Sequence, residues 1–193
     1  IVQQAMPLIT VMFVLLGTQV TAQDFDKGLE AYDNKDYTSA YREWIPLAVK
    51  GDASAQYELA FLYLVGRGVE KDNYEAINWY KKSAEQGHVM AQLHLADTYM
   101  NIENTEEAMK WYRLAADQGV ARAQEMLGWM HYFGEGVPQD YTEAYAWLSI
   151  AATGGDAEVV AARDRLASKL TPEELPKAQK RATELFEKYG SGK

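Results

Sequence analysis

The sequence repeats itself, and this internal repetition limits the possible folds more than any other feature. Residues 53–88 and residues 121–156 align without a gap at an offset of 68 residues. A shorter copy fills residues 89–120, and a degenerate first copy occupies residues 23–52. The copies end in glycines spaced by 36, 32 and 36 residues, at Gly51, Gly87, Gly119 and Gly155. Such a period is typical of repeat proteins, in which each unit buries its apolar face against its neighbours.

The aligned columns describe the faces of helices. Alanine recurs in two columns eight residues apart, at Ala40, Ala76, Ala108 and Ala144 and at Ala48, Ala84, Ala116 and Ala152. Residues with this spacing share one helical face, where small side chains let helices approach closely. Tryptophan and leucine columns, together with small residues expected at the helix crossing, complete the pattern: Trp79, Trp111 and Trp147; Leu59, Leu95 and Leu127; Ala60, Ala96 and Gly128. We therefore expect buried stripes on both helices of each repeat.

Helix start and stop signals recur at the same period. The residues aligned before each second helix are all strong N-cap types, namely Asp36, Asp72, Asn104 and Asp140. Glutamates follow three positions later at Glu75, Glu107 and Glu143, which suggests a capping box. The glycines that end the copies suit the left-handed position after a helix. Together these signals predict an all-α chain of antiparallel helix pairs.

Two segments carry a family resemblance, GRGVEKDNYEAINWYKKSAEQG at residues 66–87 and GEGVPQDYTEAYAWLSIAATGG at residues 134–155. They resemble the Sel1-like repeats, a branch of the tetratricopeptide superfamily. The resemblance implies a right-handed α/α solenoid that acts as a protein-interaction module. Residues 89–120 depart from it because they lack the Gly-x-Gly-Val turn. His131 also departs, since tyrosine holds this column in the two preceding copies.

Both ends of the chain differ from the repeat. Residues 7–20 are uncharged and are followed by Val20-Thr21-Ala22, which favours a signal peptide over residues 1–22, cleaved after Ala22. This interpretation requires a basic n-region that is missing here, and an uncleaved anchor is the alternative. Either reading places the rest of the chain outside the cytoplasm. Cleavage near Ala22 predicts a periplasmic or secreted bacterial protein without a transmembrane span in the mature chain. At the other end, residues 157–193 are expected to form a capping helix pair, in which the first helix begins near Ala157 and the second begins at Thr171-Pro172.

Composition and motifs argue against several functions. The net charge of −9 disfavours nucleic-acid binding, and the absence of cysteine excludes thiolate metal sites and a cysteine nucleophile. The three histidines lack ligand spacing, so we expect no metal and no cofactor. Gly66-Arg67-Gly68 and Gly134-Glu135-Gly136 resemble phosphate loops only superficially, because neither follows a strand or precedes Lys-Ser/Thr. We find no catalytic constellation and predict a protein that is not an enzyme.

The remaining candidate is a binding surface on the first helix of each pair. Carried over from the tetratricopeptide pattern, the expected positions in the concave groove are Tyr57, Phe61, Leu64, Leu93, Asp97, Met100, Glu125, Trp129 and Tyr132. Most are apolar or aromatic, as in interaction surfaces. We expect a scaffold or adaptor of the cell envelope that binds a protein or peptide, with self-association possible. Recognition of a cell-wall glycan or peptidoglycan fragment is the alternative.

Overall fold

The structure is a computed structural model, and it describes residues 24–189. Residues 24–33 are helical, and they are followed by α2 (Tyr37–Val49), α3 (Ala53–Val65), α4 (Asn73–Glu85), α5 (Val89–Asn101), α6 (Thr105–Asp117), α7 (Ala121–Phe133), α8 (Tyr141–Ala151), the 3-10 turn η1 (Ala152–Gly154), α9 (Ala157–Ala167) and α10 (Glu174–Tyr189). No strand occurs between residues 24 and 189. The expected signal peptide lies outside the described residues. Within the described part, none of the helices has the length and apolar character needed to span a bilayer.

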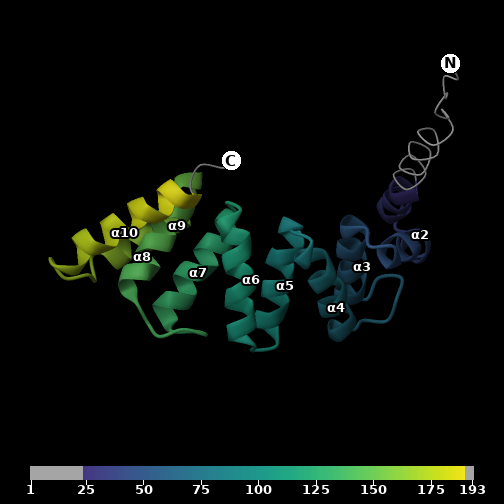
Figure 1. Ribbon diagram of the computed structural model, residues 1–193, viewed down its shortest axis with the longest axis horizontal. Coiled ribbons are helices and arrows are strands. Elements are labelled where there is room, and N and C mark those ends of the chain that lie inside the picture. The colour runs from purple at the N-terminus through teal and green to yellow at the C-terminus, as the bar shows by residue number, and fades with distance from the viewer. Residues whose placement is uncertain (1–23, 190–193) are drawn as a thin grey trace, which may run out of the picture. The chain divides into compact units, whose positions relative to one another are not determined.

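The chain divides into two compact units between Gln86 and Gly87. The first unit holds the helix over residues 24–33 and helices α2 to α4, and the second holds α5 to α10. Within the units, the two helices of each pair run antiparallel, as α3 and α4 do in the first and α7 and α8 in the second (Figure 1). The predicted all-α repeat solenoid is confirmed.

The alanine, leucine and small-residue columns are buried, whereas Trp79 and Trp111 of the tryptophan column are only half-buried. All eight column alanines and the three column leucines are buried. The predicted close crossing is confirmed in the second unit, where a Cβ added to Gly128 would lie 2.7 Å from Cγ of Leu148. Tryptophan occupies the core of both units, since Trp44 and Trp147 are completely buried. The alanine and glycine positions thus set the helix separation, and the large side chains fill the space that remains.

The predicted N-caps are confirmed, but the capping boxes are only half formed. Asp72 and Asp140 each accept hydrogen bonds from backbone N–H groups two and three residues later, at 2.8 and 3.1 Å. Their own N–H groups donate to the carbonyls of Tyr63 and His131, near the end of the preceding helix. In a full capping box, the glutamate carboxylate would accept a hydrogen bond from the backbone N–H of the N-cap residue. That N–H already donates to a carbonyl here, so the carboxylate of Glu143 can bind another partner.

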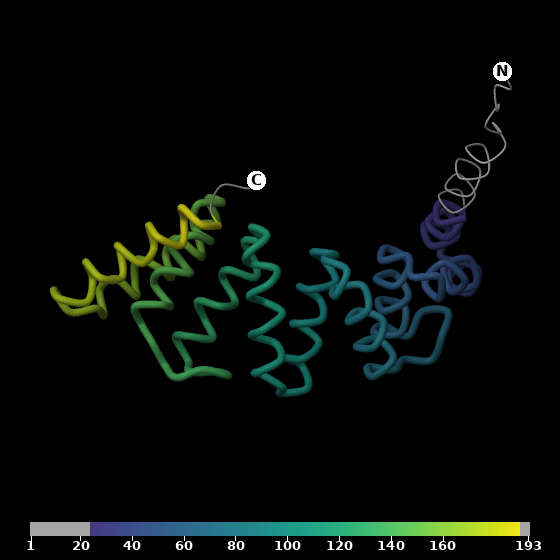
Figure 2. The backbone as a smooth tube through the Cα atoms, viewed as in Figure 1, coloured from purple at the N-terminus to yellow at the C-terminus, as the bar shows by residue number. Residues whose placement is uncertain are grey.

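Each loop that contains Gly-x-Gly packs on the second helix of the preceding repeat, α2 or α6, and the tube in Figure 2 shows the longer path of these loops. Gly68 has a φ of +72°, and a Cβ there would lie 2.4 Å from the backbone of Tyr37 at the start of α2. Gly136 repeats this arrangement, with 2.8 Å to the carbonyl oxygen of Thr105 at the start of α6. The second glycine of each loop is therefore required both for its conformation and for its close approach.

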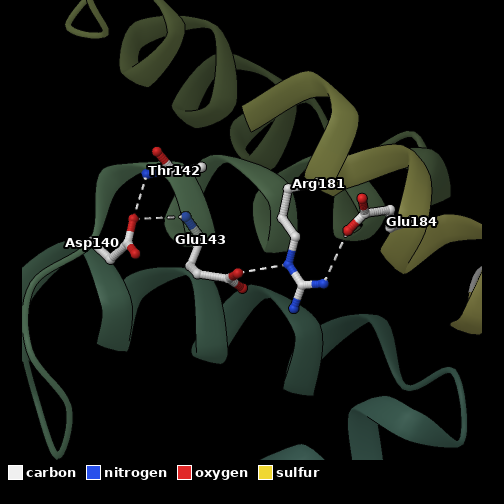
Figure 3. Close-up of polar contacts among 5 residues, drawn as sticks. All are labelled: Asp140, Thr142, Glu143, Arg181 and Glu184. Atoms are coloured by element: carbon white, nitrogen blue, oxygen red, sulfur yellow. Dashed lines mark hydrogen bonds and ion pairs between the residues drawn. The ribbon is translucent and has the colours of Figure 1, made fainter. Parts of the chain in front are cut away.

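The C-terminal helices are fixed to the last repeat by charge and by aromatic stacking. Arg181 of α10 donates to Glu143 of α8 at 2.6 Å and contacts Glu184 at 3.3 Å (Figure 3). Tyr189 stacks on Trp147, with ring centroids 5.9 Å apart. The predicted capping box is present, because Thr171 and Glu174 exchange both of its hydrogen bonds, but α10 begins at Glu174, two residues after the predicted Pro172.

Candidate functional site

The strongest candidate site is a pocket of about 310 Å³ in the second unit, which we call the aromatic pocket. Its lining residues come from α7, α8, α9 and the turn after α9: Trp129, Tyr132, Phe133, Leu148, Ala162, Arg165, Leu166 and Lys169. Helical periodicity explains the α7 contribution, because residues three and four apart lie on one face of a helix. A pocket of this size can hold one large side chain of a partner.

Aromatic rings form one wall of the pocket. Trp129 stacks on Phe133 with centroids 6.0 Å apart, and Tyr132 meets both rings edge to face at 5.8 and 4.9 Å. Trp129 is held in place by its indole N–H, which donates to Glu125 at 3.1 Å. Phe133 is 62% exposed, although it is a large apolar side chain in the last turn of α7. This wall therefore offers rigid apolar surface that no residue of the described chain covers fully.

Both charged residues in the lining are cations. Lys169 donates a hydrogen bond to the hydroxyl of Tyr132, and its Nζ lies 4.9 Å from the centre of that ring. The hydrogen bond to Tyr132 raises the pKa of Lys169, so the amine stays protonated. Neither Lys169 nor Arg165 forms an ion pair with an acidic residue in the range 24–189. The pocket thus combines apolar surface with positive charge in a chain whose net charge is −9.

The other predicted groove residues of the second unit lie in three different environments. Asp97 accepts a hydrogen bond from Tyr112 at 2.5 Å and pairs with Arg122 at 3.6 Å, which makes it part of a polar network. Burial and this carboxylate both raise the pKa of Tyr112. Met100 is half-buried against the core. The predicted groove position of Leu93 is wrong. Its side chain is only 4% exposed and packs in the core, because it points toward the helix pair.

The predicted groove residues of the first unit are half-buried. The ring of Tyr57 lies 5.7 Å from that of Tyr80, and the ring of Phe61 lies 6.5 Å from that of Tyr32. Leu64 is also half-buried. These residues present less exposed aromatic surface than Phe133 does, so the second unit provides the better candidate site.

Sequence reasoning missed the second wall of the pocket. Arg165, Leu166 and Lys169 belong to the segment expected to be only a cap. The sequence does contain a signal for a further repeat at this end, since Ala157 follows Ala121 by 36 residues, the length of a full repeat. In this register Arg165 takes the position that Trp129 holds in α7. Helix α9 thus acts as the first helix of a further unit.

Three comparisons bear on the chain as a whole. The Sel1 repeat family matches residues 53–88, 89–120 and 121–156. A Sel1 repeat protein from Oxalobacter formigenes is similar in structure, with a TM-score of 0.68, 31% identity, and coverage of 85% of this chain and 70% of that one. The c5321 antigen of uropathogenic Escherichia coli, described as protective and as displaying an SLR fold, matches with a TM-score of 0.51 and 29% identity over 88% of this chain and 46% of its own.

A curated relative adds a biological context. An exopolysaccharide production negative regulator from Rhizobium leguminosarum bv. viciae is 29% identical over 149 residues, which are 68% of this chain and 56% of the relative. The chain therefore spans about half the length of this relative and of the Escherichia coli antigen.

Proposed function

This chain belongs to the Sel1 repeat family, whose members are generally protein-interaction scaffolds and typically not catalysts, and from this premise we propose that it binds a partner protein through the aromatic pocket. The observation that carries the proposal is the exposed ring of Phe133 beside Trp129 and Tyr132. Exposed aromatic clusters rimmed by polar groups are typical of interaction sites, and aromatic residues dominate their binding energy.

The charges around the pocket define the partner segment more closely. Arg165 and Lys169 favour a carboxylate next to the side chain that enters the pocket. The partner segment is therefore a peptide in which an aromatic or large aliphatic residue is adjacent to an acidic one. A neutral or basic segment would bind more weakly, because Lys169 and Arg165 would be desolvated without an anionic partner.

The first residues and the relatives support a proposed cellular setting. The uncharged segment that ends near Ala22 supports a location in the bacterial envelope or outside the cell. The regulator from Rhizobium supports a role in controlling the output of an envelope or surface system. In such a role this chain is an adaptor, and its activity depends on the partner that it holds.

Site-specific crosslinking tests the proposal. A photoreactive phenylalanine at Phe133 is expected to capture a protein from an envelope extract, whereas the same residue at Tyr74 is not. Tyr74 is a matched control because it is also an exposed aromatic, at the start of α4. Charge reversal in Lys169→Glu should remove the Phe133 adduct without loss of helical circular dichroism.

The other outcomes of the crosslinking experiment distinguish between the alternatives. Equal capture at Phe133 and Tyr74 would contradict a specific site in the aromatic pocket. An adduct between two copies of this chain would show that the aromatic pocket binds a second copy of the chain and not a different protein. Binding of soluble peptidoglycan fragments with no protein adduct would favour the glycan alternative.

A further inference from the structure

A buried glutamine pair recurs in the repeats. Gln56 and Gln92 lie near the start of a first helix and are each 4% exposed. Each accepts a hydrogen bond at its Oε1 from a second glutamine at the end of the following helix. The donors are Nε2 of Gln86 and Nε2 of Gln118, both at 2.8 Å. We number the copies over residues 23–52, 53–88, 89–120 and 121–156 as repeats 1 to 4. A side-chain carboxamide therefore satisfies the carbonyl of the buried glutamine in repeat 2 and in repeat 3.

Repeat 4 retains the acceptor and lacks the donor. Gln124 aligns with Gln56, is 3% exposed, and donates from Nε2 to the carbonyl of Ala116, as Gln56 does to Ala48. The position of the second glutamine is held by Gly154. No hydrogen bond from residues 24–189 reaches Oε1 of Gln124. This oxygen is not among the buried unpartnered atoms of the described residues, so it remains accessible to an added donor.

A pocket of about 250 Å³ lies where that donor would be. Ile150 and Tyr189 supply apolar surface, and Gln118, Gln124 and Thr153 supply polar groups. The hydroxyl of Thr153 donates to the carbonyl of Ile150 at 2.7 Å, which leaves its oxygen as an acceptor. The amide nitrogen of Gln118 donates to Gln92, and the side-chain oxygen of Gln118 is therefore a second acceptor. The side chains of Gln118, Gln124 and Thr153 therefore each leave an acceptor oxygen in the lining.

The uncharged lining and the volume of the pocket indicate the charge and the size of the group that it can bind. None of the residues lining this pocket carries a charge, which favours a neutral donor over an ammonium or guanidinium group. The volume is several times the roughly 30 Å³ that one water molecule occupies, so a single water does not fill it. A primary carboxamide has two N–H donors, is neutral, and is the group that Gln86 and Gln118 supply in the other repeats.

We propose that this pocket binds the side chain of a glutamine from a partner polypeptide, which completes in trans the pair that repeats 2 and 3 form internally. Its carboxamide N–H donates to Oε1 of Gln124, and its methylene groups pack on Ile150 and Tyr189. The proposal does not depend on the aromatic pocket, since no residue lines both pockets.

The first arm of the test restores the internal donor. A Cβ at Gly154 would have no atom within 4 Å, and its φ lies outside the left-handed region, so Gly154→Gln fits the fold. We expect Gly154→Gln to melt about 2–4 °C above Gly154→Ala, the value for one buried hydrogen bond. The alanine variant controls for the loss of glycine flexibility. Equal melting temperatures would overturn the proposal, because the pocket would not accept a carboxamide.

The second arm uses an external probe, N-acetyl-L-glutamine N-methylamide, and follows by NMR the backbone amide resonances of Gly119 and Thr153, which line the pocket and are unchanged in every variant. We expect saturable shifts in the wild-type chain at millimolar probe. Binding should be at least tenfold weaker in Gly154→Gln, where the internal side chain occupies the pocket, and in Gln124→Met, which lacks the acceptor. The matched probe N-acetyl-L-glutamate N-methylamide should not bind, since its carboxylate is charged and lacks N–H donors.

Three outcomes would overturn the proposal in this arm. They are equal shifts with the glutamate probe, shifts that persist in Gly154→Gln, and no shift at all in the wild-type chain. If Gly154→Gln is stabilised but the glutamine probe does not bind, the pocket is a packing defect of the last repeat and takes no external glutamine.

Discussion

Repeat 2 (residues 53–88) and repeat 4 (residues 121–156) share one backbone and differ in their surfaces. Their first helices end in Gly66 and Gly134, at φ, ψ of 70°, 40° and 75°, 31°. Their second helices begin at Asp72 and Asp140 with the same pair of capping distances. In contrast, Phe61, Leu64 and Val65 of repeat 2 become Trp129, Tyr132 and Phe133 in repeat 4. Residues that set the backbone are thus retained, and those that line the candidate site change.

The tryptophan column should give the largest difference between the two repeats. Trp147 is completely buried under α10, whereas Trp79 keeps part of its ring in solvent and lies beside Lys82. Trp147→Ala should lower the free energy of unfolding by about 3–5 kcal/mol and Trp79→Ala by about 1–2 kcal/mol. Urea unfolding followed by circular dichroism measures both.

A conservative variant separates ring packing from the indole N–H. Nε1 of Trp147 is buried and has no hydrogen-bond partner among the described residues. Trp147→Phe keeps an aromatic ring against Tyr189 and removes this donor, so its cost should stay below about 1.5 kcal/mol. Equal losses for Trp147→Ala and Trp79→Ala would show that α10 adds no stability to repeat 4.

The second glycine of each long loop should give the next largest effect. Gly68→Ala should cost about 2–4 kcal/mol, because the alanine would have an unfavourable φ and its Cβ would collide with the backbone of Tyr37. Gly136→Ala should cost somewhat less, since its closest approach is 2.8 Å. Gly87→Ala is the control, with a φ of +86° and nothing within 4 Å, and should cost about 1 kcal/mol. If all three variants lose the same stability in urea, close approach contributes nothing.

The half-buried acid Glu58 makes the stability of repeat 2 depend on pH in a way that repeat 4 does not share. Burial raises the pKa of Glu58 to about 7, and repeat 4 has Met126 at this position. Because the folded pKa lies above the unfolded value of 4.5, folding favours the protonated acid. The stabilisation is complete below pH 4.5 and is lost as the pH rises through 7.

Glu58→Gln should therefore match the wild type near pH 4 and exceed it at pH 8. The full shift corresponds to roughly 3 kcal/mol, which we reduce to about 1–2 kcal/mol because the side chain is partly exposed to solvent. Urea unfolding at both pH values is the measurement. A constant difference between the two proteins from pH 4 to pH 8 would contradict the raised pKa of Glu58.

The short loops of repeats 1 and 3 should give the smallest effect. Lys35 and Glu103 each directly precede an N-cap residue, Asp36 and Asn104, and have left-handed φ values of 63° and 61°. Lys35→Gly and Glu103→Gly should each raise the free energy of unfolding by about 0.5–1 kcal/mol. Asn34→Gly is the control at a position without a positive φ, and it should not stabilise the chain.

The sequence by itself determined the helix pairs of this protein. The helix limits depend on Asp72, Asp140 and the glycines that end the repeats, whose hydrogen bonds and φ values are local to a few residues. The buried faces depend on alanine and leucine columns at helical spacing. Local interactions of this kind recur wherever the motif recurs, and this is why they can be predicted without a structure.

Only the tertiary structure decided which surfaces are exposed and which residues meet. It placed Leu93 in the core, paired Arg181 with Glu143, and brought α9 to the rings of α7 to form the aromatic pocket. It also showed that Gly154 leaves the carbonyl of Gln124 without a donor. These contacts join residues about 30 to 40 positions apart, and they depend on the angle at which one helix pair packs on the next, which no local pattern encodes.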